Sequence, residues 1–348
     1  MRQVVTVSPE ALTLVRGPLG PTASVADAGD SLVCVYSNPA TTTLDAVDVP
    51  VGAHLPDGAP TPTVIDKIDS APPLAAGFGK HVLRVQDDVV SVLYQDRRSE
   101  SKTVLKIASR APTDTQWRLD VLEPAGDPVA LLPGPRGVPV AFWSTDTLLT
   151  RAMGGAGDPQ SLRSPFHLGS RPSTAGPSAF TAFDGAASEL VAVRGAGDGW
   201  SLSSVPGVGA IQASLVTSKG LLSVLSWDAR SRRLRLHEQR EGTGDFTQTT
   251  VTLSNGTTDV ALLAGPTVST YLFIFDETRA GSVGSAAHQV SLLAPGPILG
   301  AIGGRYRKAV LWSGDAPIQS LSAVTVGKTL YVLVLHKDLT LLRLDLRE

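Results

Sequence analysis

A short β-rich run that ends in an aromatic or polar residue close to an Asp, Asn or Thr recurs along the chain. Seven such runs begin at Leu32, Val89, Val138, Glu189, Leu221, Tyr271 and Leu330. Their starts are separated by 57, 49, 51, 32, 50 and 59 residues. A mean period of about 50 residues is typical of one four-stranded blade of a β-propeller. The repeat therefore predicts an all-β domain built from similar sheets.

Each run lies in the same frame of neighbouring strands. A strand of small or apolar residues precedes it, as in Pro73–Ala76 and Asp259–Leu263, and small residues suit the crowded innermost position of a blade. A third strand follows, as in Thr103–Ile107, and a fourth often closes the unit, as in Thr247–Leu253. The alternation of apolar and polar residues within these stretches is the period of a strand.

The runs predict a single propeller of seven blades. Their approximate bounds are 22–71, 72–126, 127–170, 171–209, 210–256, 257–318, and 319–348 together with 2–10. The strand-like Gln3–Val7 is expected to complete the last blade, so that the N-terminal strand closes the ring without an unpaired edge. The interval of 32 residues leaves room for only three strands in the fourth blade. Six blades, or a pair of β-sandwiches, are the alternatives.

Composition excludes several classes of protein. Of 348 residues, 42% are hydrophobic, so the chain can bury a large core, and a net charge of −2 argues against a nucleic-acid partner. No apolar stretch approaches the roughly 18 residues of a membrane helix. Because Cys34 is the single cysteine, neither an intrachain disulfide nor a cysteine zinc site can form. As written the chain is expected to be cytosolic, or secreted if a leader has been removed, and its oligomeric state stays open.

Conventional catalytic motifs are missing from the sequence. The six histidines form no local metal motif such as H-E-x-x-H, and no G-x-S-x-G elbow is present. We therefore expect no metal and no cofactor. The arginine-rich segment 228–241 alternates Arg233, Arg235 and His237 with leucines, which predicts that these three side chains form the solvent face of a strand.

The residues that end the runs are the candidate site. The second strand of a blade ends at the same rim in every blade, so these side chains are expected to lie near one another. Tyr94, Trp143, Trp227 and Phe275 are predicted to bind substrate by walling an apolar pocket on the axis. Arg194 and His336 stand where other runs carry an aromatic residue, and are the candidate catalytic donors to a ligand oxygen. Trp312 either joins this rim or lies on an outer strand.

The segment Val89–Asp96, followed by Thr103–Ile107 and Trp117, resembles a blade of the fungal fucose-specific lectin propellers, and Leu221–Phe246 has a similar layout. The resemblance implies a propeller fold and a glycan partner. Sugar sites of that family need an Arg on the second strand and a Glu on the third in blade after blade. Lys106 and His237 stand here at the positions of that Glu.

Blades that share packing residues but differ in loops predict one asymmetric site rather than a repeated one. In this respect the chain also resembles fungal propeller hetero-Diels–Alderases. That resemblance implies a cofactor-free cyclisation or cycloaddition of an apolar small molecule, driven by positioning and hydrogen bonding. The sequence leaves open whether the protein is an enzyme. The alternative is a lectin-like, glycan-binding or protein-interaction propeller without catalysis.

Overall fold

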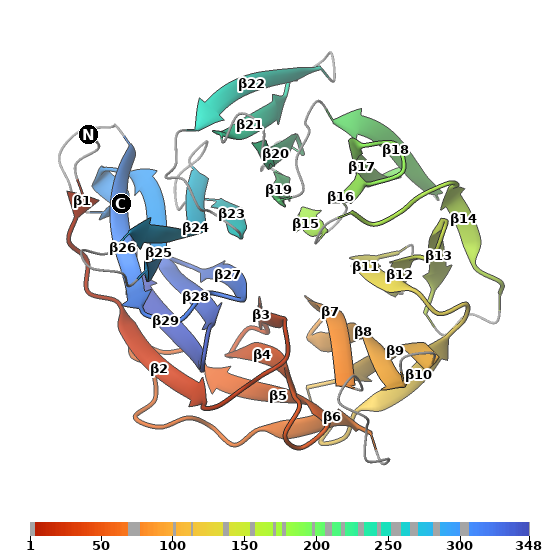
Figure 1. Ribbon diagram of the computed structural model, residues 1–348, viewed down its shortest axis with the longest axis horizontal. Coiled ribbons are helices and arrows are strands. Elements are labelled where there is room, and N and C mark those ends of the chain that lie inside the picture. Colours follow the sequence, from red (N-terminus) through yellow and green to blue (C-terminus); the bar gives the residue numbers. More distant parts are fainter. Residues whose placement is uncertain are drawn as a thin grey trace. The chain divides into compact units, whose positions relative to one another are not determined.

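The protein is an all-β, seven-bladed propeller in a computed structural model, with one short 3-10 helix, η2 (Pro297–Leu299), in the described part. Figure 1 labels its strands. The structure describes residues 4–68, 77–99, 102–112, 114–134, 139–153, 157–169, 172–175, 179–196, 199–205, 211–216, 220–228, 233–241, 245–251, 259–264, 271–280, 286–299 and 306–347. The contacts divide the chain into two compact units, and each is described separately.

The position of a strand within its blade determines its pattern of apolar and polar residues. β4 (Ser31–Asn38) lies inside its sheet, and six consecutive residues of it are buried. β18 (Gly199–Val205) is the outermost strand of its sheet, and Trp200 and Leu202 alternate with exposed serines. A strand covered on both faces needs a continuous apolar run, whereas a half-covered strand needs alternation. The continuous runs of the sequence therefore marked inner strands.

The first unit holds three blades. The blade of β3 to β6 consists of β3 (Ala23–Asp27), β4, β5 (Thr43–Pro50) and β6 (Thr63–Lys67). The blade of β23 to β26 consists of β23 (Val260–Ala264), β24 (Tyr271–Ala280), β25 (Ala286–Pro295) and β26 (Tyr306–Gly314). The last blade consists of β27 (Ser320–Val326), β28 (Thr329–Leu335) and β29 (Leu339–Asp345), with β2 (Glu10–Val15) outermost. Apolar clusters fill both seams between these blades.

The N-terminal segment completes the last blade, as predicted. The strand that does so is β2, which pairs antiparallel with β29, rather than the predicted Gln3–Val7. β1 (Val4–Val5) instead adds a parallel fifth strand to β26 of the neighbouring blade. The segment thus contributes to two successive sheets of one unit (Figure 1).

The second unit holds four blades, each a four-stranded sheet. The inner-to-outer order begins with β7 (Gly77–Gln86), β8 (Val89–Ser99), β9 (Lys102–Arg110) and β10 (Arg118–Leu122). The next sheet has β11 (Asp127–Pro133), β12 (Pro139–Ser144), β13 (Leu148–Ala152) and β14 (Gln160–Arg163). The last two have β15 (Ser173–Ala175), β16 (Ala179–Asp184), β17 (Glu189–Ala196) and β18, then β19 (Ile211–Val216), β20 (Leu222–Asp228), β21 (Arg233–Gln239) and β22 (Phe246–Val251).

The prediction of three strands in the fourth blade is wrong. Its second strand is β16, which ends in Phe183-Asp184, and β17 with Glu189 and Arg194 is the third strand. The three-residue strand β15 supplies the innermost position that the sequence did not reveal.

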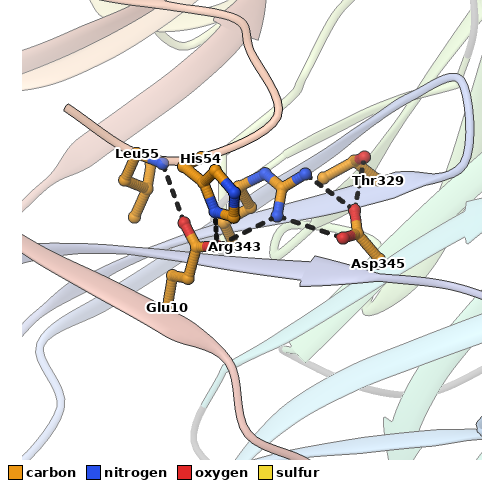
Figure 2. Close-up of polar contacts among 6 residues, drawn as sticks. All are labelled: Glu10, His54, Leu55, Thr329, Arg343 and Asp345. Carbon is orange, nitrogen blue, oxygen red and sulfur yellow. Dashed lines mark hydrogen bonds and ion pairs between the residues drawn. The ribbon is translucent and has the colours of Figure 1, made fainter.

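A polar cluster fastens β2 to its blade (Figure 2). Glu10 accepts hydrogen bonds from the backbone N–H of Leu55, 2.8 Å from Oε2, and from His54, whose Nδ1 lies 2.7 Å from Oε1. The nearly buried Arg343 of β29 lies 3.4 Å from Glu10 Oε1 and 2.9 Å from Asp345 Oδ1. The Leu55 hydrogen bond, followed by that of His54, holds the pKa of Glu10 below its ordinary value.

Because its folded-state pKa is depressed, Glu10 stabilises the fold above its ordinary pKa, and this contribution disappears as the pH falls through the folded value. We expect Glu10→Gln to lower the melting temperature at neutral pH, with the difference from wild type vanishing in acid. Thermal unfolding across a pH series measures this. Asp57→Asn serves as the control, because it removes an exposed carboxylate from the loop that also holds His54 and Leu55. An equal effect of both variants would contradict the anchoring role.

Candidate functional site

The predicted pocket aromatics lie inside the blades. Trp143 on β12 is fully buried, belongs to the apolar seam shared with Leu93 of β8, and donates from Nε1 to the carbonyl oxygen of Pro124 at 2.9 Å. Tyr94 is also fully buried, but alternation places it on the opposite face of β8 from Leu93. The structure therefore does not bring Tyr94 and Trp143 together.

The remaining predicted aromatics lie on two further blades. Phe275 on β24 is buried, and Lys308 Nζ lies 5.8 Å from the centre of its ring. Lys308 also pairs with the buried Glu277. Trp227 lies on β20 by its backbone, and its side chain is outside the described part of the structure.

The burial of Trp143 predicts a large structural effect. Trp143→Ala is expected to lower the free energy of unfolding by about 3–5 kcal/mol, because a cavity replaces the indole. Urea denaturation followed by circular dichroism gives this value. Val64→Ala, at an exposed apolar position, is expected to cost less than about 0.5 kcal/mol. Similar losses in the two variants would show that Trp143 does not pack as its burial indicates.

His336 occupies the turn between β28 and β29. Its ring lies 4.6 Å from that of Trp312 on the outer strand β26, at an interplanar angle of 35°. Nδ1 accepts a hydrogen bond from the N–H of Asp338 at 3.5 Å, and Nε2 lies 3.4 Å from Thr340 Oγ1. Burial lowers the pKa of His336, while the charges of nearby aspartates oppose this shift. Both ring nitrogens are thus engaged within the turn.

Arg194 lies on β17 and reaches across to the next blade of the same unit. Its Nη1 donates to Gln239 Oε1 at 2.9 Å, and its Nη2 donates to the carbonyl oxygen of Gly220 at 2.8 Å. Gln239 Oε1 also accepts from the N–H of Leu222 at 3.3 Å, so the amide oxygen is held toward Arg194. Both acceptors of the guanidinium are neutral.

Two cations of the same unit, Lys106 and Arg163, meet carboxylates. Lys106 Nζ lies 2.7 Å from Asp96, and Arg163 Nε lies 2.8 Å from the buried Asp184. Among the described residues no carboxylate pairs with Arg194, and burial alone lowers its pKa. Removing a cation from water without an opposing charge is unfavourable. An anion placed beside Arg194 would therefore stabilise its guanidinium.

A second basic group lies on the same seam. His237 on β21 is 1% exposed, and its Nε2 lies 3.4 Å from the hydroxyl of buried Ser226. Its ladder partner Val224 packs with Ala192 of β17, so this face of the sheet faces Arg194 and its blade. Nδ1 is buried without a hydrogen-bond partner among the described atoms. Burial lowers the pKa of His237, and the charge of Arg235 lowers it further.

We name the set formed by Arg194, Gly220, Ser226, His237 and Gln239 the Arg194 seam. The prediction that His237 belongs to a solvent face is wrong, because the neighbouring blade covers that face of β21. Gln239 and Ser226 were missed altogether. The signal available in the sequence was the position of Gln239, two residues beyond His237 on the same strand face. Among the described residues no cluster of His, Cys, Asp and Glu could hold a metal ion.

The lowered pKa of His237 predicts an acid-sensitive contribution to stability. The unfolded chain binds the imidazole proton more tightly, so stability falls as the pH drops through the ordinary histidine pKa of about 6.5. In the His237→Gln variant, the decrease in stability that is due to His237 is expected to disappear. Chemical denaturation from about pH 7.5 to about pH 5 tests it, with the exposed His167→Gln as control. Parallel pH profiles for wild type and His237→Gln would contradict the assignment.

Comparison with known proteins identifies a fold and no family. No protein-family model matches the chain, and no curated protein matches it. Virginiamycin B lyase from Staphylococcus aureus is similar in structure, with a TM-score of 0.58, 12% identity, and coverage of 97% of this chain and 99% of the lyase. YCF48 bound to D1 peptide gives a TM-score of 0.58 and 11% identity, over 99% of this chain and 98% of YCF48. YCF48 from Cyanidioschyzon merolae gives a TM-score of 0.55 and 13% identity, over 97% of this chain and 99% of that protein.

Identities of 11–13% show the shared propeller fold alone. The resemblance to fungal fucose-specific lectins and to hetero-Diels–Alderases receives no support beyond that fold. In the part of the chain that the structure describes, no helix has the length and apolar character needed to span a membrane.

Proposed function

We propose that this protein is a single-site binding propeller for a small ligand that carries an anionic group, a phosphate or a carboxylate, held at the Arg194 seam. The observation that carries the proposal is the half-buried guanidinium of Arg194, which donates to two neutral oxygens and has no described carboxylate partner. A ligand anion would supply the missing charge through charge-assisted hydrogen bonds.

The surroundings of Arg194 support an anion rather than a cation. His237 and Arg235 lie on the same strand face as Gln239, and Arg235 adds positive charge there. Neither the pKa of Arg194 nor that of His237 is raised by a nearby acid. The hydroxyl of Ser226 adds a neutral polar group to the seam. A blade-specific site of this kind agrees with the predicted single asymmetric site.

The seam replaces the apolar axial pocket as the preferred location. Tyr94, Trp143 and Phe275 are too buried to offer ring surface to an apolar ligand. Cyclisation or cycloaddition therefore stays a prediction from the sequence. Because the similar structures include both a lyase and a peptide-bound protein, the fold does not choose between chemistry and binding.

Calorimetric titration of the full chain with inorganic phosphate and with citrate tests the proposal. Arg194→Gln is expected to weaken anion binding about 10- to 100-fold, because hydrogen bonds to a charged group contribute about 1.5–3 kcal/mol. Gln239→Glu is nearly isosteric and gives Arg194 an internal anion, so it should also abolish binding without loss of stability.

The matched control is Arg240→Gln, which removes an exposed arginine next to Gln239. It is expected to bind the anions as wild type does. If neither anion binds wild type, or if Arg194→Gln and Arg240→Gln weaken binding equally, the proposed function fails.

A further inference from the structure

The outermost strand β10 presents an unusual edge. It ends the sheet β10-β9-β8-β7 and pairs antiparallel with β9 (Figure 1). Leu122 is fully buried in the seam with the next blade, which holds the strand in place. Yet Leu119 and Val121 are 42% and 52% exposed, two of three large apolar side chains so exposed in the described structure. β10 contains neither Lys nor Pro, and its charged residues are Arg118 and Asp120.

Opposite charges occupy the other face of the strand. The side chains of Arg118 and Asp120 are 76% and 43% exposed, and Arg118 Nε lies 3.7 Å from Asp120 Oδ2. Two residues of opposite sign, one position either side of Leu119, form a self-complementary pattern. If the strand meets an antiparallel copy of itself centred on Leu119, Arg118 of each strand lies directly opposite Asp120 of the other.

The same register also matches apolar groups. Leu119 faces its own copy, and Trp117 faces Val121 of the other strand. The ring of Trp117 is held beneath the guanidinium of Arg110, 4.8 Å from the ring centre, and is therefore oriented before association. A register centred on Asp120 would instead oppose two carboxylates, which is unfavourable. Of these two registers, the charges favour the one centred on Leu119.

We propose that two copies of this chain form a two-fold symmetric dimer by antiparallel pairing of β10 with β10, centred on Leu119. The paired edges join two four-stranded blades into one continuous eight-stranded sheet. The contact is isologous, so each copy supplies the same residues and association stops at two. This assembly is independent of the Arg194 seam.

Sedimentation velocity of the full chain over a concentration series tests the dimer. Wild type is expected to show a concentration-dependent monomer–dimer equilibrium. Arg118→Asp or Asp120→Arg alone opposes like charges in both symmetry-related pairs and should weaken the dimer at least about tenfold. The double variant Arg118→Asp with Asp120→Arg restores opposite charges and should recover dimerisation.

Leu119→Lys is expected to abolish the dimer, whereas Ser203→Lys, at an exposed position of the outer strand β18, should leave it unchanged. All substituted positions are exposed, and melting temperatures verify that each variant is folded. A wild type that stays monomeric, a double variant that fails to recover, or a Leu119→Lys protein that still dimerises would overturn the proposal. Anion titration of the monomeric variants keeps this outcome separate from that of the proposed function.

Discussion

The antiparallel ladder between β2 and β29 is the constraint on which the last blade depends. It joins Glu10 to Arg343, which are 333 positions apart, so almost the whole chain lies between two paired residues. The entropy lost in closing such a loop grows only slowly with its length, and a short ladder reinforced by side chains can offset it. The carboxylate of Glu10, bonded to a second blade as well as to Arg343, supplies that reinforcement. β1 then extends the same segment onto a third sheet.

The period of the apolar runs was enough to predict the fold. Seven continuous runs correspond to seven sheets because inner strands are covered on both faces. Closure of the last sheet by the N-terminal segment was predicted, although β2 rather than Gln3–Val7 supplies the strand. The sequence analysis assigned the wrong position to a strand where a third strand is as buried as a second strand. β17 is as deeply buried as a second strand, with Leu190 to Val193 all fully buried, so its sequence is indistinguishable from one. The pair Phe183-Asp184 gives more even spacing to the flanking runs and marks the true second strand.

The candidate site was less predictable than the fold for a related reason. Alternation shows which residues of a strand share a face, but it does not show whether a neighbouring blade covers that face. His237 was therefore placed in solvent, although it is buried, and Trp143 was placed in a pocket, although it fills a seam. Arg194 was selected because of its charge. Its hydrogen-bond partner Gln239 lies 45 positions away in the sequence, so local patterns could not predict the pair.

Two neighbouring seams of the second unit differ in the group that an arginine contacts across the seam. In one seam Arg163 of β14 meets the carboxylates of Asp184 and Glu189, and the ion pairs are complete within the protein. In the next seam the arginine of β17 meets the amide of Gln239 instead. The two side chains accept hydrogen bonds in the same way, but only the carboxylate neutralises the guanidinium. The amide of Gln239 fixes the geometry of Arg194 without neutralising it, and we propose that a ligand anion supplies the opposing charge. This difference in the acceptor is the reason for proposing that the second seam binds an anion, whereas the ion pairs of the first seam stabilise the fold.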